Sequence, residues 1–149
     1  MNHSPIRILL ADDDEDDRLI FVDALKQIKQ AVNVTTVNNG VELMDYLKEH
    51  EAKELPHILF LDLNMPLKGG LECLREIRST KELKDLSVAI YSTSASEEDI
   101  ENTFIQGANV YIKKPNDFTR LVNVLSEVIK VNWQYTTSDL NKENFVLSI

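Results

Sequence analysis

Short runs of apolar residues alternate along this chain with longer segments in which apolar residues recur every three or four positions. Unbroken apolar runs are typical of strands buried on both faces of a parallel sheet. Apolar residues that recur every three or four positions are typical of an amphipathic helix. The pattern predicts five strands, at residues 6–10, 32–37, 58–61, 88–91 and 110–112, of which the second alternates rather than running unbroken.

A helix is predicted after each strand. The first carries Phe21, Leu25 and Ile28 at i, i+4 and i+7. Its apolar face is expected to include also Leu19, Ile20, Val22 and Ala24. The other apolar positions are Val41, Leu43, Met44 and Leu47 in the second helix, Leu71, Cys73, Leu74 and Ile77 in the third, and Phe118, Leu121, Val122, Leu125, Val128 and Ile129 in the fifth. Ser96, with acids after it, is a typical capping start for the fourth helix, which Gly107 ends.

Strands that alternate with helices predict an α/β fold, in which a doubly wound parallel sheet carries helices on both faces. Ligands of such sheets bind beyond the carboxyl ends of the strands. In this chain those ends carry Asp12, Asp13, Asp62, Ser92 and Lys114. We therefore expect the chemistry of the protein at this edge.

Composition narrows the class of protein. A length of 149 residues with 43% hydrophobic content suits one domain with a single core. The net charge of −9 argues against direct binding to nucleic acid, and no apolar run is long enough to cross a membrane. Residues 1–5 lack a signal-peptide pattern, so a cytoplasmic location is expected. The single cysteine, Cys73, is expected to be a small core residue.

The residues at the strand ends share a chemistry. Asp12, Asp13 and Asp62 repel one another unless a cation or protons compensate. Three carboxylates and a backbone carbonyl just past Asp62 suit a hard ion such as Mg²⁺. Lys114 adds a positive charge and Ser92 a hydroxyl group. A metal, an ammonium group and a hydroxyl around one carboxylate match the needs of phosphoryl transfer to that carboxylate.

Each feature also has a simpler interpretation. Asp62 can be a turn residue, and the acids at 12–17 can be a helix N-terminus, of which residues 15–17 are expected on the solvated side. Lys114 before a proline can be a surface lysine, and Ser92 alone carries no signal. The histidines show no ligand spacing and are expected at exposed or loop positions: His3, His50 and His57. The coincidence of five residues at one edge favours the phosphoryl-transfer interpretation.

Four motifs occur together: ILLADDD at the first strand, LDLNMP at the third, Ser92 after the fourth and YIKKP at the fifth. With them the chain resembles the CheY-like response-regulator receiver domain of two-component signalling over residues 5–132. The resemblance implies a flavodoxin-like strand order 2-1-3-4-5, Mg²⁺ as cofactor, and a sensor histidine kinase or histidine phosphotransfer protein as phosphodonor. It implies no enzymatic activity beyond the chain's own phosphorylation and dephosphorylation.

The resemblance also implies a role for each site residue. Asp62 is the phosphoacceptor, Lys114 contacts the phosphoryl group, and Ser92 with Tyr111 forms the conformational switch. The implied Mg²⁺ ligands are Asp13 with Asp12 assisting, Asp62, and the backbone carbonyl of Asn64. The Lys114–Pro115 bond is expected to be cis. The signal would pass to an unidentified protein, and a second copy of the chain is a possible partner.

The chain departs from the receiver pattern in three places. Ser92 replaces the commoner threonine, Thr93 is bulkier than the usual alanine or glycine, and Gly69 stands where many receivers have aspartate. The motifs LDLNMP, SEED and KVNW resemble stand-alone receivers, which include the partners of bacterial phytochromes. Residues 133–149 are predicted to be a tail that docks on the receiver or on a partner, with a frayed end as the alternative.

Two other functions are compatible with parts of the sequence. Asp62-Leu63-Asn64 is similar to the haloacid-dehalogenase motif, which would make the protein a phosphohydrolase. That family normally has a second aspartate, which acts as acid/base, where Asn64 stands. Its nucleophile follows an early strand, whereas Asp62 follows the third. The other alternative is a receiver-like module that signals without phosphorylation, against which the complete set of site residues argues.

Overall fold

The computed structural model describes residues 5–131 and 145–147. Its elements are β1 (Ile6–Ala11), α1 (Glu15–Leu25), β2 (Val32–Val37), α2 (Gly40–Glu49), the 3-10 turn η1 (Ala52–Glu54), β3 (Ile58–Leu61), α3 (Gly70–Ser79), β4 (Ser87–Ser92), α4 (Glu97–Ile105), β5 (Val110–Lys113), α5 (Phe118–Lys130) and β6 (Val146–Leu147). The five predicted strands and five predicted helices are all present. Among the described residues no helix is long and apolar enough to cross a membrane.

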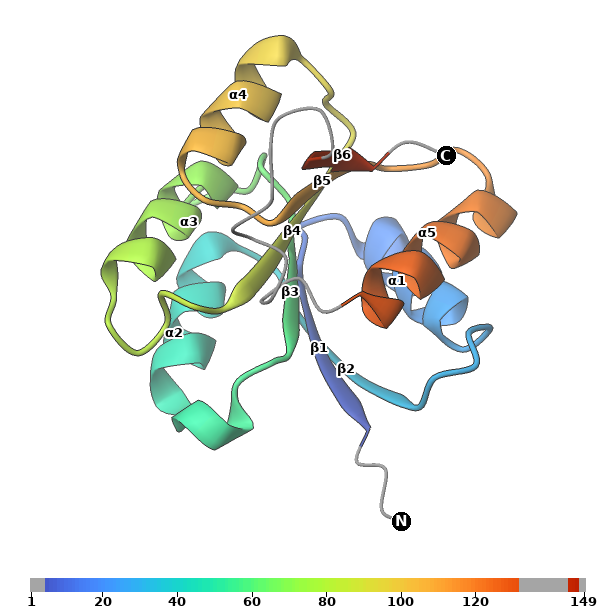
Figure 1. Cartoon of the computed structure of the whole chain (residues 1–149), viewed down its shortest axis with the longest axis horizontal. Coiled ribbons are helices and arrows are strands. Elements are labelled where there is room, and N and C mark those ends of the chain that lie inside the picture. The colour runs from blue at the N-terminus through green and yellow to red at the C-terminus, as the bar shows by residue number, and fades with distance from the viewer. Residues whose placement is uncertain (1–4, 132–144, 148–149) are drawn as a thin grey trace.

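The strands form one parallel sheet in the order β2-β1-β3-β4-β5-β6 (Figure 1). The predicted order 2-1-3-4-5 is confirmed. The structure adds β6, a strand of two residues that pairs with the outer edge of β5. An edge that the predicted sheet left open is therefore covered.

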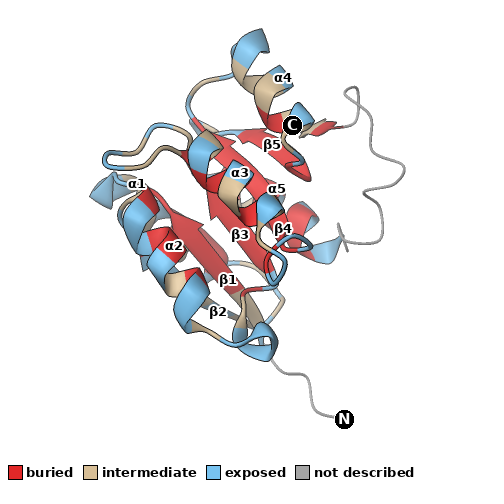
Figure 2. Cartoon of the chain, turned by 90° about the vertical axis from the view of Figure 1, so that its left-hand side faces the viewer, coloured by how far each residue is buried: buried red, intermediate tan, exposed pale blue. Residues whose placement is uncertain are grey.

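Helices cover both faces of the sheet, as predicted. On one face α2, α3 and α4 pack over a core that includes Leu9, Leu59 and Val88, which are neighbours in the strand register. On the other face α1 and α5 pack over a core that includes Leu10 and Phe60. The burial colours of Figure 2 show the central strands enclosed between the two helical layers. Because β3 and β4 are buried at every residue, β3 and the middle of β4, residues 88–90, are apolar without alternation.

Side-chain caps start most of the helices. Asp14, Asn39, Ser96 and Asp117 each accept a hydrogen bond from a backbone N–H in the first turn of α1, α2, α4 and α5, respectively. These caps fix where each helix leaves the carboxyl edge of the sheet. The cap predicted at Ser96 is confirmed.

Several expectations about apolar positions are wrong. Helix α1 ends at Leu25, so Ile28 lies beyond the helix, although it still packs against the same core as Phe21. Leu19 is 58% exposed and Ile20 45% exposed. The buried positions of α1 are centred on Phe21. Leu19 lies two residues before it, about 200° around the helix and on the opposite side.

Val41 and Phe118, at the starts of α2 and α5, are also exposed. Apolar residues in a first turn extend past the edge of the sheet, where less of the core can cover them.

The expected cis bond between Lys114 and Pro115 is not found, since the described residues contain no cis peptide bond. The trans form is the more stable isomer of most X–Pro bonds. The predicted tail comprises residues 133–149, of which only 145–147 are described. The predicted domain boundary at residue 132 stays a prediction.

Candidate functional site

Three charged residues follow directly after strands at the carboxyl edge of the sheet. The backbone N–H of Asp12 donates to Val37 on β2 at 3.1 Å, and that of Asp62 donates to Ala11 on β1 at 3.0 Å. The N–H of Lys114 donates to Ser92 on β4 at 2.8 Å. Each residue therefore continues the hydrogen bonding of the sheet by one position, and this fixes the origin of each side chain.

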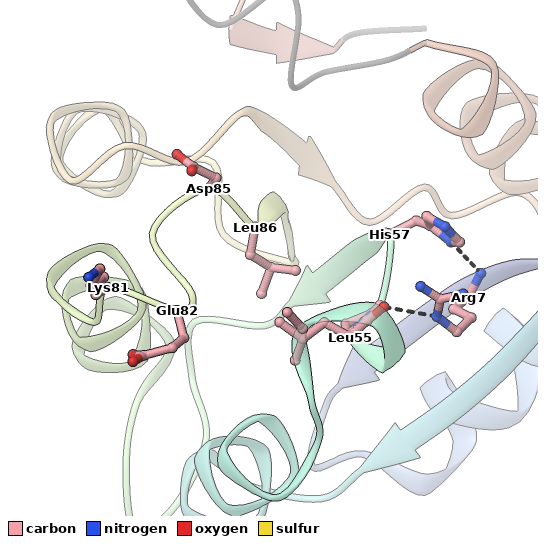
Figure 3. Close-up of a pocket in the computed structure, with 9 residues that line it drawn as sticks. Arg7, Leu55, His57, Lys81, Glu82, Asp85 and Leu86 are labelled. Carbon is pink, nitrogen blue, oxygen red and sulfur yellow. Dashed lines mark hydrogen bonds between the residues drawn. The ribbon is translucent and has the colours of Figure 1, made fainter.

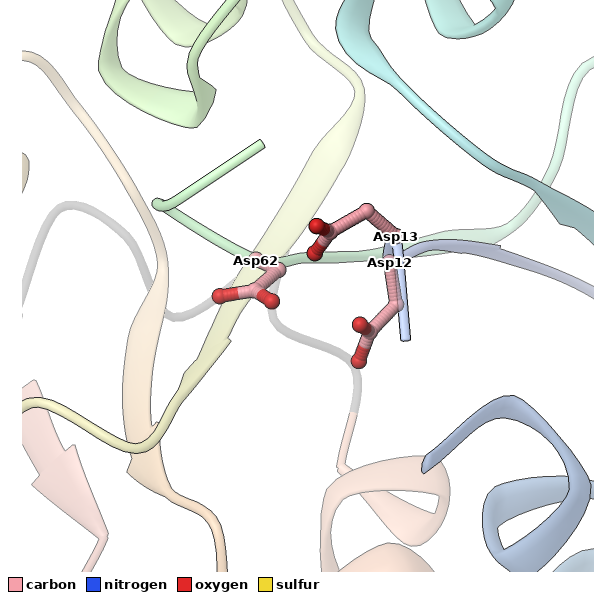
Figure 4. A group of neighbouring side chains, drawn as sticks. All are labelled: Asp12, Asp13 and Asp62. Carbon is pink, nitrogen blue, oxygen red and sulfur yellow. The ribbon is translucent and has the colours of Figure 1, made fainter. Parts of the chain in front are cut away.

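Three carboxylates converge at this edge (Figure 4). Asp12, Asp13 and Asp62 each present an oxygen, and these oxygens lie within 4.8 Å of one another. Asp12 is fully buried and Asp62 is 6% exposed, whereas Asp13 is exposed to solvent. The cluster is therefore rigid on its inner side and accessible on its outer side.

Gly70 allows the chain to turn closely around the cluster. A Cβ atom at this position would collide with the backbone carbonyl oxygen of Asp62. The helix that follows Asp62, α3, can therefore begin against the site only because its first residue is glycine.

Lys114 reaches into the centre of the site. Its Nζ lies 2.8 Å from an oxygen of Asp12, 3.3 Å from Asp62 and 2.8 Å from Asp17. It also lies over the ring of Tyr91, 5.3 Å from the centroid. The lysine is thus a partly buried cation, and the interpretation of Lys114 as a surface residue is wrong.

Asp17 is a contact that the sequence pattern did not indicate. It was expected on the solvated side of α1, but it is half-buried and pairs with Lys114. Because α1 begins after the cap at Asp14, its third residue faces the site. The helical phase could be set only once that start was known.

Burial controls the ionisation of the central pair. It raises the pKa of Asp62 to about 6; the Lys114 ammonium opposes this shift and the Asp12 carboxylate adds to it. Burial also lowers the pKa of Lys114, but contacts with Asp12 and Asp17 more than offset that effect. The pKa of Lys114 therefore lies above its ordinary value, and the lysine is charged.

The donor set fits a divalent cation. The Oδ2 atom of Asp12 is buried and has no hydrogen bond, although the Lys114 ammonium lies 2.8 Å away. A carboxylate oxygen has two lone pairs, so one remains available to an ion beside this ammonium. Carboxylate oxygens in a net anionic cluster, open to water beside Asp13, are typical ligands of hard ions such as Mg²⁺. Asn64 lies two residues past Asp62, and its N–H is 3.5 Å from Oδ1 of Asp62.

Ser92 and Tyr111 meet the loop after β4 rather than Asp62. The Ser92 hydroxyl is buried and accepts a hydrogen bond from the N–H of Ser94 at 3.2 Å. The Tyr111 hydroxyl donates to the carbonyl oxygen of Ser94 at 2.7 Å. The Ser94 hydroxyl in turn donates to Asp99 on α4 at 2.6 Å. Both predicted switch residues therefore hold the same loop.

A different cavity lies at the opposite end of the strands (Figure 3). It has a volume of about 230 Å³ and is lined by residues that include Arg7, Leu55 and His57. The N–H of Arg7 donates to Nδ1 of His57, and its guanidinium donates to the carbonyl of Leu55, both at 2.9 Å. These polar groups serve the packing of the β1 and β3 entrances and lie far from the carboxylates.

The matching family is the response regulator receiver domain, whose model covers residues 8–126. The chain belongs to this family. It is therefore a response regulator of two-component signalling, a class of protein that receives phosphoryl groups from kinases and acts on partners.

Its relatives include stand-alone regulators of phytochromes. The response regulator Rcp1 of Synechocystis sp. is 28% identical over 130 residues, which span 85% of this chain and 88% of Rcp1. The structure of the phosphorylated cyanobacterial phytochrome response regulator RcpA has 32% identity and a TM-score of 0.76, over 85% of this chain and 93% of RcpA. The structure of the Mn²⁺-bound form of Rcp1 has 28% identity and a TM-score of 0.74, over 83% of this chain and 91% of Rcp1. The predicted resemblance is confirmed.

Proposed function

We propose that Asp62 accepts a phosphoryl group from a sensor histidine kinase or a histidine phosphotransfer protein. The observation that carries the proposal is the convergence of Asp62 with two further carboxylates and the Lys114 ammonium at the carboxyl edge. One oxygen of Asp62 attacks the phosphorus atom and forms an acyl phosphate. The bond from phosphorus to the donor histidine breaks, and its electron pair returns to the imidazole ring.

Lys114 is proposed to stabilise the charge of the transferred group. Its ammonium already lies 3.3 Å from Asp62, so phosphoryl oxygens attached to that residue would come within its reach. Asp12 and Asp17 keep the ammonium charged and hold it in place before transfer. This arrangement needs little reorganisation when the phosphoryl group arrives.

Asp12, Asp13 and Asp62, with the backbone carbonyl of Asn64, are proposed to hold Mg²⁺. When bound, the ion neutralises charge on the transferring oxygens. The neighbour Rcp1, whose structure was solved in a Mn²⁺-bound form, supports a divalent metal at such a site. The chain's own task is to present two ligands rigidly, Asp12 and Asp62, and a third, Asp13, at the solvent side.

Ser92 and Tyr111 are proposed to convert phosphorylation into a change of shape. They hold the loop that links β4 to α4, so a movement of the Ser92 hydroxyl toward the phosphoryl group would draw that loop toward the site. The signal would then reach a partner protein through α4, β5 and α5. Neither turnover of an external substrate nor binding of nucleic acid forms part of the proposal, and a cytoplasmic location stays a prediction.

The metal assignment is tested by Asp13→Asn, with Asp16→Asn as the matched control. Both residues are exposed acids near the start of α1, but of the two only Asp13 belongs to the carboxylate cluster. We expect Asp13→Asn to weaken Mg²⁺ binding about tenfold or more in calorimetry, as loss of a charged ligand should. It should also slow phosphorylation by acetyl phosphate, followed by intact mass. Equal weakening in both variants would show that the ligand assignment is wrong.

A further inference from the structure

Residues 145–147 occupy the outer edge of β5. Val146 is in register with Tyr111, and Leu147 with Ile112. Phe145 is fully buried, with its ring centroid 5.3 Å from that of Phe104 on α4 and 6.1 Å from that of Tyr111. A strand edge and an aromatic pocket thus bind the same short segment.

This segment covers the predicted switch tyrosine. Tyr111 is fully buried, and its hydroxyl reaches inward to Ser94. Phe145 fills the space beside its ring, on the same face of the sheet and at its edge. For Tyr111 to swing outward past the edge of β5, Phe145 would have to leave. Docking of the segment therefore favours the inward position of Tyr111.

The inward position of Tyr111 is connected to the phosphorylation site. Its hydroxyl holds the carbonyl of Ser94, while the N–H of Ser94 donates to the hydroxyl of Ser92. Ser92 ends β4, beside Lys114, whose backbone N–H donates to the Ser92 carbonyl. A continuous path of contacts runs from Phe145 to the end of the strand next to Asp62.

We propose that residues 145–147 are an intramolecular ligand of the β5 edge, and that docking of this ligand and phosphorylation of Asp62 favour each other. The proposal rests on the proposed phosphoacceptor function. Both events would favour the same state, with Tyr111 inward and the Ser94 loop drawn toward the site. Coupling between two sites is reciprocal, so each event must strengthen the other by the same factor. The edge fits an extended segment with an aromatic residue just before the paired positions, as main-chain pairing with a side-chain pocket requires.

The first part of the test measures docking without a phosphodonor. In the full chain we expect Phe145→Ala to speed hydrogen exchange across residues 104–113 about fivefold or more, because β5 loses its edge partner. Phe118→Ala removes an equivalent ring from an exposed position and should leave this exchange unchanged. Unchanged exchange in Phe145→Ala would overturn the docking. So would a wild-type dimer that this variant converts to a monomer, because the segment would then bind a second copy.

The second part measures coupling. In wild type, beryllofluoride with Mg²⁺ should slow exchange of residues 145–147 about fivefold, a value at the low end of ordinary coupling. Phe145→Ala should raise the acetyl phosphate concentration for half-maximal phosphorylation, while Phe145→Leu, which keeps an apolar side chain, should lie close to wild type. The coupling alone would be overturned if Phe145→Ala and wild type were phosphorylated equally and beryllofluoride did not change the hydrogen exchange of residues 145–147. Absence of phosphorylation in every protein would overturn the proposed function and the coupling with it. The beryllofluoride measurement uses the wild-type chain, so it holds even if Phe145→Ala unfolds.

Discussion

Asp62 is kept in the folded chain at a cost to stability. Its carboxylate lies beside the carboxylate of Asp12 in a buried site, and Lys114 offsets only part of the resulting penalty on the charged form. Like charges held together with only partial compensation are typical of a site built for a ligand rather than for stability. The same carboxylate is the one proposed to react.

The penalty on the charged form of Asp62 makes the stability of the chain depend on pH. In the absence of metal, the folded chain binds a proton at Asp62 up to about pH 6, whereas the unfolded chain releases it near the ordinary value of 3.8. The stability contributed by the protonated form is therefore fully present below the pKa of the unfolded chain. It is lost as pH rises through the pKa of the folded chain. Asp62→Asn removes the penalty, so at pH 7.5 the variant should exceed wild type by roughly 1–3 kcal/mol, with little difference near pH 4.

Urea unfolding in EDTA at both pH values measures the difference. Asp16→Asn, at an exposed position, is the control and should match wild type at each pH. If the Asp62→Asn variant were less stable than wild type at pH 7.5, Asp62 would be a net stabilising partner of Lys114, and the site would carry no penalty on its charged form.

At the scale of elements, Arg78 holds the connections that place β4 and β5. It stands in the last turn of α3, and its guanidinium donates to the carbonyls of Lys84, Leu86 and Gly107 and to the side chain of Asn109. Asn109 also accepts a hydrogen bond from the N–H of Val88 on β4, at 2.8 Å. One side chain thus links α3 to the segments that enter β4 and β5, the strands that carry Ser92 and Lys114.

Arg78→Ala should therefore destabilise the chain. Loss of the guanidinium removes its hydrogen bonds to two half-buried acceptors, on Leu86 and Asn109, and to two exposed carbonyls, and we expect a loss of about 3 kcal/mol in the free energy of unfolding. Arg75→Ala is the matched control, because Arg75 lies on the same helix and is exposed. Chemical denaturation of the two variants gives the comparison, and equal, small losses would contradict the structural role of Arg78.

The connection from β4 to α4 yields a prediction about signalling. Ser92→Ala should leave Asp62 able to accept a phosphoryl group, since the carboxylates and Lys114 remain, but should uncouple that event from α4 and β5. Wild type should show altered hydrogen exchange across residues 97–112 on addition of beryllofluoride and Mg²⁺. The variant should show little or none of that change. A wild-type response in the variant would exclude Ser92 as the coupling residue.

At the scale of the whole molecule, much of the fold could be predicted because buried strands and helices differ in the spacing of their apolar residues along the sequence. The unbroken run Ile58–Leu61 indicates a strand enclosed on both faces, and parallel strands bring their carboxyl ends to one edge. Asp12, Asp62 and Lys114 could thus be placed together without knowledge of any contact. Their distances confirm the placement.

Other features depended on information that local patterns do not carry. The exposure of Leu19 and the contact of Asp17 with Lys114 follow from the rotational phase of α1, which the cap at Asp14 sets. The burial of Phe145 follows from a pairing across more than thirty residues, between a two-residue strand and β5. A segment that short has no periodicity of its own, so only the structure could reveal where it binds.

The central claim is that Asp62, and no other carboxylate of the cluster, carries the phosphoryl group. Its most direct test is to treat the full chain with acetyl phosphate and Mg²⁺, reduce the acyl phosphate with borohydride, and locate the resulting homoserine by peptide mass. We expect the modification at position 62 alone and only when Mg²⁺ is present. Homoserine at position 12 or 13, or none at position 62 under conditions that phosphorylate the protein, would contradict the account.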